Sequence, residues 1–317
     1  MSETTRLAPP SAGPEGDVFG ATAADRFDDA VASRRGEVRG RSRPARIIAF
    51  LVHRPFLLLA ALWILVVLVA AVAPGLFHTQ DPLGGDPIDK LQGPSAAHWF
   101  GTDQLGRDLF ARVLHGTALT LGAALLAVVI GLVVGSILGL LAGFVGSWVD
   151  TVVMRIADVL LAIPSLLLSL ALITVLGFGT VHVAIAVGLA SIATVSRIMR
   201  SEVVRVRSSV YVEAAAASGN RWWRVLLVHV LPNSGGPVLV LAALEFGTAI
   251  LAVSSLSFLG YGAQPPTPEW GSLVSTGRDF LRNAWWLTTA PGVVIALTVL
   301  SANRVSRALD TEGRRSR

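Results

Sequence analysis

The chain has 317 residues, of which 53% are hydrophobic and only 15% are charged, and it contains no cysteine. Soluble domains average about 25% charged residues, so this chain carries too little polar surface to cover a water-soluble globule. The composition excludes a chain that is disordered throughout, a disulfide-stapled fold and a thiolate metal site, and the net charge of +5 indicates membrane topology rather than nucleic-acid binding.

Six apolar runs follow one another along the chain, and an α-helix needs about 20 apolar residues to cross the bilayer core. The runs are predicted at 56–73, 119–144, 159–176, 181–198, 237–259 and 286–300. The first run ends in an Ala-Val-Ala sequence that resembles a signal-peptide cleavage site, but it is longer than a signal-peptide core and begins more than fifty residues into the chain. We therefore predict an all-α membrane protein with six spans.

The placement of basic residues predicts the orientation of these spans. With the N-terminus in the cytosol, 21 of the 26 basic residues fall in inner segments, as the positive-inside rule requires. Both termini are then cytoplasmic, the longest inner connection runs over 199–236, and the largest outer segments are 74–116 and 260–283. The predicted organisation is listed in chain order: a disordered cytoplasmic tail at 1–46, the first span with an extracytoplasmic segment at 47–116, a core at 117–303 and a basic cytoplasmic tail at 304–317.

Glycines recur every four residues in the second run, at Gly131, Gly135, Gly139 and Gly143. A spacing of four places them on one face of a helix, where small residues let two membrane helices approach closely. We predict a helix-packing seam here rather than a pore lining.

The inner connection has its own helical pattern. Its run of alanines favours a helix, and Gly219 follows where a left-handed residue would end that helix. Residues 221–230 then predict a second helix that closes at Pro232. Glu213 lies near the start of the first helix, where a carboxylate complements the helix dipole, and the narrow alanine face suits a groove on another protein.

The spacing of Glu-Ala-Ala, Gly and Leu-Pro in this connection resembles the EAA loop of ABC importer permeases. The residues that carry the resemblance are Glu213, Ala214, Ala215, Gly219, Leu231 and Pro232. His229 stands where the general pattern prefers isoleucine, as in the peptide-importer branch. The stretches 98–108, 146–150 and 257–271 resemble dipeptide, oligopeptide and nickel permeases, most closely their C-type subunit.

This resemblance implies a type I ABC importer permease fold in a bacterial plasma membrane and no catalytic residue, metal or cofactor on this chain. It also implies four partner subunits: a homologous second permease, two cytoplasmic ATPases that bind ATP and Mg²⁺, and an extracytoplasmic solute-binding protein. The six EAA residues are then the ATPase-coupling set. The residues themselves also indicate that ATP is hydrolysed by partner subunits. The phosphate loop of an ATPase needs a lysine, and the only lysine of this chain, Lys90, lies in a predicted outer segment.

The resemblance favours import of di- or oligopeptides, with nickel or another small solute such as glutathione as the alternative. A secondary transporter driven by an ion gradient is a distant alternative. That class predicts inverted repeats and paired carboxylates at the membrane midplane, and the sequence has no clear repeat and one acidic residue in mid-span.

That acidic residue is Glu245, and an ionisable group in a span is costly unless it is paired or faces water. It either faces the translocation path, where it would attract the amino end of a peptide, or it is paired with the second permease or protonated. The outer segments supply candidate docking residues for the solute-binding protein, which are Asp103, Arg107, Asp108, Gln264 and Trp270. For the first three the alternative is a role in stabilising the outer segment itself.

Overall fold

Apolar helices of membrane-spanning length make up about half of the part of the chain that the structure describes. The computed structural model describes residues 55–315, and their side chains to residue 308; the predicted tail at 1–46 lies outside this range. Five helices within it are long and apolar enough to cross a membrane, and a bent pair of helices makes a sixth candidate span. The predicted all-α fold is confirmed. The five helices are α3 (Pro55–Val72), α4 (Leu109–Val145), α7 (Thr180–Arg207), α10 (Leu231–Phe258) and α12 (Trp286–Arg315).

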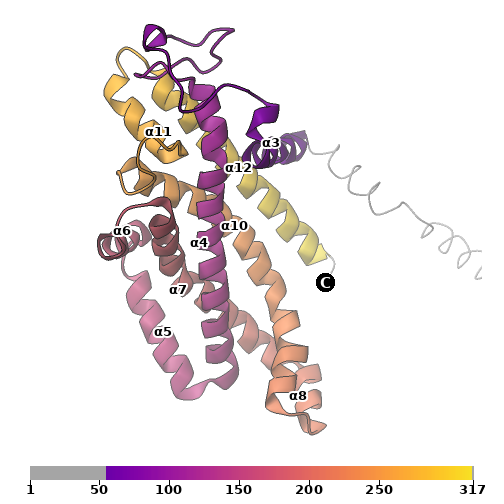
Figure 1. Cartoon of the computed structure of the whole chain (residues 1–317). Helices are drawn as coiled ribbons and strands as arrows, with labels where there is room; N and C mark the ends of the chain where they lie inside the picture. Colours follow the sequence, from indigo (N-terminus) through magenta and orange to yellow (C-terminus); the bar gives the residue numbers. More distant parts are fainter. Residues whose placement is uncertain (1–54, 316–317) are drawn as a thin grey trace, which may run out of the picture. The chain divides into compact units, whose positions relative to one another are not determined.

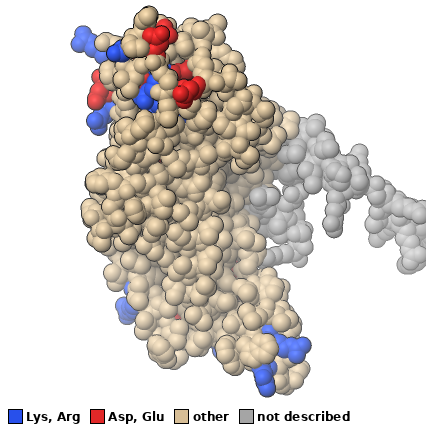
Figure 2. All heavy atoms as spheres, viewed as in Figure 1, with Lys and Arg blue, Asp and Glu red and all other residues tan. Residues whose placement is uncertain are grey.

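Shorter helices lie between the spans. The two predicted outer segments contain η1 (Pro74–Leu76), η2 (Pro87–Asp89), α11 (Trp270–Gly277) and η4 (Arg278–Phe280). The predicted inner connection contains α8 (Val210–Ala217), α9 (Trp222–Arg224) and η3 (Val225–Val230). Figure 1 shows α8 and α11 at opposite ends of the long helices. Figure 2 shows charged residues gathered at these two ends, with an uncharged band between them on the face in view. This distribution is the one expected of a bundle that crosses a bilayer.

The third predicted span is not one straight helix. The chain forms α5 (Ser147–Leu161) and α6 (Ser165–Leu176), which meet at an angle of 95°. Pro164 is the cause, because its ring removes a backbone donor and disfavours helical geometry at the residue before it. The prediction of a continuous helix over 159–176 is therefore wrong.

Two predicted helix ends also differ from the structure. Pro232 does not close the second helix of the inner connection. A π-helical segment, η3, ends at Val230, and α10 begins at the next residue, so Pro232 lies in the first turn of α10. A missing amide donor is tolerated in the first turn of a helix. The helices from Trp222 to Phe258 thus form one continuous 37-residue unit. The last helix continues past the predicted end at Leu300 to Arg315, since no proline interrupts it there.

The glycine face of α4 packs directly against α7, which confirms the predicted seam. A β-carbon added to Gly135 would lie 2.7 Å from the β-carbon of Val195, and one added to Gly143 would lie 2.9 Å from the carbonyl oxygen of Arg200. Gly188 of α7 makes the reciprocal approach to α4. No real side chain occupies such distances, so the two helices are held together along this seam by backbone contact.

Candidate functional site

The inner connection folds into a short helix, a turn and the start of a long helix. Val212 anchors α8 in the bundle, since its side chain is 3% exposed and packs in an apolar cluster with α7 and with the residues that follow α9. The cluster includes Val203 and Val206 of α7 and Val225 and Val230 of η3. A displacement of α8 therefore reaches two long helices at once.

The turn after α8 has the predicted left-handed residue. Gly219 adopts φ +80°, a conformation that other residues adopt only with strain, and its amide donates to the carbonyl of Ala216 at 3.1 Å. The side-chain amide of Asn220 donates to the carbonyl of Ala215 at 2.9 Å. These bonds satisfy the carbonyls that the end of α8 leaves free, so the turn is locally closed.

The opposite face of α8 points away from the bundle. Val210, Ala214 and Ala217 repeat at intervals of four and three residues, share one helix face and are all exposed. Glu213 is exposed beside them in the first turn, and its carboxylate makes no hydrogen bond or ion pair with the part of the chain that the structure describes. This face is narrow, apolar and small, with one free negative charge at its start.

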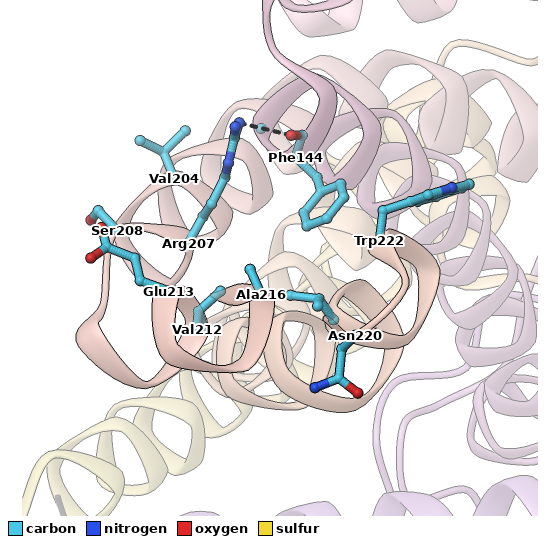
Figure 3. Close-up of a pocket in the computed structure, with 11 residues that line it drawn as sticks. Phe144, Val204, Arg207, Ser208, Val212, Glu213, Ala216, Asn220 and Trp222 are labelled. Atoms are coloured by element: carbon cyan, nitrogen blue, oxygen red, sulfur yellow. Dashed lines mark hydrogen bonds between the residues drawn. The ribbon is translucent and has the colours of Figure 1, made fainter. Parts of the chain in front are cut away.

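A cavity of about 720 Å³ separates the inner side of α8 from the ends of α4 and α7. Figure 3 shows Phe144, Arg207, Ala216 and Trp222 around it. Arg207 donates a 2.8 Å hydrogen bond to the carbonyl of Phe144, and its guanidinium lies 5.8 Å from the centre of the Phe144 ring. This contact ties the C-terminal end of α7 to the last turn of α4, where a cation is favourable.

The six EAA residues separate into two groups. Glu213, Ala214, Ala215 and Gly219 lie together on α8 and its turn, whereas Leu231 and Pro232 lie at the start of α10. Leu231 is half-buried and packs against the apolar cluster that holds Val212, and Pro232 is exposed.

A second cavity, of about 250 Å³, lies within the bundle between α4, α6, α7 and α10. Glu245 of α10 is half-buried and lines it, and it is the one ionisable group among the described residues that do so. Thr248 donates a 3.2 Å hydrogen bond to the Glu245 carboxylate. Hydroxyl groups supply the rest of the polar lining, from Ser165, Ser169, Ser191, Thr194 and Thr248.

Three predicted docking residues are instead buried in the outer segment. Asp103 is 4% exposed, and its carboxylate accepts a 2.7 Å hydrogen bond from Arg107 Nε together with bonds from the amides of Leu105 and Arg107. Asp108 is 3% exposed, caps α4 through the amide of Ala111 at 2.7 Å, and lies 2.9 Å from His98 Nδ1. The burial of these three side chains favours the structural alternative.

Trp270 is also fully buried, and its indole donates to the carbonyl of Val113 at 3.0 Å. Gln264 is exposed, so it is the one member of the predicted docking set that lies on the described surface. The Trp270 bond fastens α11 to the beginning of α4, which makes α11 part of the bundle rather than a loose outer loop.

Glu269 is a residue that sequence reasoning missed. Its side chain is fully buried at the start of α11, and its carboxylate accepts bonds from the amides of Gly271 at 3.2 Å and Ser272 at 3.4 Å. Thr120 of α4 donates to the same carboxylate at 3.5 Å. Burial raises the pKa of Glu269 above its ordinary value, although these amide bonds oppose the rise. The sequence signal was weak, because glutamate is not a preferred capping residue.

The raised pKa of Glu269 predicts a pH-dependent stability. Between the pKa of the unfolded chain and the higher pKa of the folded protein, the folded state holds the extra proton, so stability falls as pH rises through that window. Glu269→Gln stays neutral and should lose this dependence. The melting temperature of the purified protein, measured from pH 5 to pH 8, should fall more steeply for the wild type, by about 2–4 °C for each kcal/mol lost. Equal slopes would contradict this account.

The membrane-spanning helices, the exposed helix α8 and the polar cavity within the bundle are the features of a multi-pass membrane transport component. Residues 135–314 match the family described as binding-protein-dependent transport system inner membrane component. This chain belongs to that family, which comprises the permease subunits of ABC importers, and it is a multi-pass protein of the bacterial plasma membrane.

Three curated relatives share most of their length with this chain. The dipeptide transport system permease protein of Alkalihalophilus pseudofirmus is 42% identical over 77% of this chain and 80% of its own. A probable D,D-dipeptide transport system permease protein of Escherichia coli is 38% identical over 85% of this chain and 90% of its own. The glutathione transport system permease protein of Pectobacterium atrosepticum is 38% identical over 77% of this chain and 81% of its own.

The fold also matches a crystal structure of an amino acid ABC transporter with histidines. The TM-score is 0.50 at 18% identity, over 64% of this chain and 94% of that one. At this identity the likeness concerns the fold alone.

Proposed function

We propose that this chain is the translocating subunit of an ATP-driven importer of di- or oligopeptides. It would pair with a second, homologous permease, two cytosolic ATPases that bind ATP and Mg²⁺, and an extracytoplasmic solute-binding protein. The observation that carries the proposal is the α8 face of Val210, Ala214 and Ala217, which is exposed at the cytosolic end beside the unpaired Glu213. The three relatives are named as permeases for dipeptides, D,D-dipeptides and glutathione, and these names support a peptide substrate over nickel.

Energy would reach the bundle through α8. An ATPase that holds the exposed face of α8 in a groove can displace this helix when it closes on ATP. The displacement passes to α7 and η3 through the cluster around Val212, and to α4 through the Arg207–Phe144 contact. ATP then acts as a ligand that shifts an equilibrium between outward-open and inward-open states. Under this proposal the energy-coupling parts lie in the core predicted for 117–303, and the segments predicted at 1–46, 47–116 and 304–317 flank it, although α12 runs across the boundary between the core and the last segment.

The cavity that Glu245 lines is the proposed passage for substrate. Its hydroxyl groups can exchange hydrogen bonds with a peptide backbone, and a carboxylate in a low-dielectric site attracts the positive amino end of a peptide strongly. Passage would be completed by the second permease, so the cavity is one wall of the path.

Glu245→Gln should reduce uptake of dipeptides that have a free amino end by about tenfold, which corresponds to about 1.4 kcal/mol of lost attraction. Uptake of the same peptides with an acetylated amino end should not change relative to wild type. Glu202→Gln is the matched control, because Glu202 pairs with Arg205 at the cytosolic end of α7, outside the cavity. If uptake of all peptides were unchanged while the complex still assembled, the pathway role of Glu245 would be lost.

The substrate class is tested in cells that lack this chain. Uptake of a labelled dipeptide, of glutathione and of nickel is compared before and after the wild-type chain is restored. The proposal expects restoration of dipeptide uptake. Restoration of nickel uptake alone would overturn the peptide assignment and leave the importer assignment in place.

A further inference from the structure

Helices α3 and α12 lie side by side (Figure 1) and leave a groove of about 560 Å³ between them. Each helix contributes four residues at the positions i, i+3, i+4 and i+7, a spacing that places them on one helix face. At one end the helices are joined, because Trp63 Nε1 donates a 3.1 Å hydrogen bond to Thr298 Oγ1. The lining residues are Phe56, Leu59, Ala60 and Trp63 of α3 and Leu297, Leu300, Ser301 and Arg304 of α12.

Most of the groove is apolar and open. Its bulky side chains Phe56, Leu59 and Leu300 are each more than half exposed. Both helices are long and apolar enough to cross a membrane, so these side chains meet lipid or another membrane helix rather than water. The molecule that fills the groove must therefore present an apolar surface over two turns of helix, or about 11 Å.

One end of the groove carries a positive charge. Arg304 is exposed there and follows Trp286, the first residue of α12, by eighteen residues, or about 27 Å of helix. The hydrocarbon core is about 30 Å thick, so in the predicted orientation Arg304 lies near the cytosolic boundary of the core. It makes no hydrogen bond or ion pair with the described part of the chain, where no acidic side chain lines the groove. The occupant must supply a negative group at this end, because a guanidinium stays charged.

We propose that the groove binds one anionic phospholipid of the cytoplasmic leaflet, with its phosphate on Arg304 and one acyl chain along the apolar wall toward Trp63. Such a lipid carries its phosphate and its apolar chain at the depths where the groove presents its cation and its apolar wall. A guanidinium can donate two parallel hydrogen bonds to phosphate oxygens, and basic pockets between membrane helices on the cytoplasmic side suit anionic headgroups. A helix of another subunit would leave the cation unpaired unless it brought an acidic residue to the same depth.

The position of the groove gives the lipid a structural role. Helix α12 lies within residues 135–314, which match the family, whereas α3 precedes them. A lipid in the groove would contact both helices and hold the first span against the family core. This role does not depend on which substrate is transported.

Lipid retention by the full transport complex tests the site. The complex is reconstituted in vesicles of equal phosphatidylglycerol and phosphatidylcholine, extracted in mild detergent and analysed by native mass spectrometry. Arg304→Gln should lower the ratio of retained phosphatidylglycerol to phosphatidylcholine about fivefold, the effect expected of one arginine near an anionic surface. Arg304→Lys keeps the charge and should retain most of the preference. An Arg304→Gln ratio equal to that of the wild type would overturn the proposal.

Arg155→Gln is the matched control, because Arg155 is also exposed and without a partner among the described residues but lies on α5, outside the groove. This variant should match the wild type, and an equal loss of preference would mean that general surface charge, not the groove, holds the lipid.

A second measurement identifies the occupant directly. The chain has no cysteine, so Leu300→Cys can carry a benzophenone maleimide as the single label on this chain. Irradiation of the labelled complex in the same vesicles should yield a phospholipid adduct. A cross-link to the second permease in its place would show that a protein helix fills the groove and would overturn the proposal.

Discussion

Replacement of Ala214 by tryptophan should abolish ATP-driven uptake while the chain still folds. Ala214 is exposed in the middle of the α8 face that it shares with Val210 and Ala217, so an indole there meets solvent in the isolated chain. A bulky ring cannot enter a groove shaped for alanine, and the ATPase would be excluded by steric overlap. Uptake should fall by more than about tenfold, and a tenfold fall corresponds to a loss of about 1.4 kcal/mol in the free energy that couples the ATPase to this chain. Copurification of the ATPase with the tagged chain should fall in parallel.

Ala214→Ser is the matched control, because serine is nearly as small and should retain both the ATPase and uptake. The melting temperature of each purified variant shows whether the chain itself is intact. An Ala214→Trp complex that kept its ATPase and its uptake would remove α8 as the docking element.

Gly139→Val should have the largest effect on the stability of the bundle. A β-carbon at Gly139 would lie 2.7 Å from the β-carbon of Met199 and would also overlap the carbonyl of Ser196. The clash is with backbone, which cannot rotate away, so α4 and α7 would have to separate. Overpacking of this kind costs about 1–3 kcal/mol even where side chains can adjust. We expect a lower melting temperature and loss of the monodisperse protein in detergent.

Gly122→Val is the control on the same helix. No atom lies within 4 Å of a β-carbon added at Gly122, so the variant should match the wild type in both measurements. If both glycine variants lost stability equally, the cause would be helix propensity rather than the contact with α7.

Local chemistry accounts for the features that the sequence predicts correctly. The apolar runs place the spans because a helix is the only open segment that satisfies its own backbone in lipid. The period of four among the glycines of α4 predicts a seam, and the glycine after the alanine run predicts a left-handed turn at Gly219, because each depends on near neighbours in the chain.

The features that depend on distant parts of the chain are not predictable in this way. The 95° turn has a local cause in Pro164, but a straight helix and a bent pair have the same hydropathy, so a search for apolar runs alone does not detect it. The charged residues of the outer segment suggest a docking surface because charges are usually exposed. Asp103 and Arg107 are buried instead because they pair with each other, and the indole of Trp270 finds its acceptor at Val113, far away in sequence.

The central claim is that ATP hydrolysed by partner subunits drives peptides through this chain, and uptake by sealed proteoliposomes tests it most directly. The complete complex is reconstituted with ATP on the side of α8, and the solute-binding protein and a labelled dipeptide are supplied on the other side. We predict accumulation of the dipeptide that requires ATP hydrolysis and stops when a non-hydrolysable analogue replaces ATP. Accumulation without ATP, driven by an imposed ion gradient, would contradict the account.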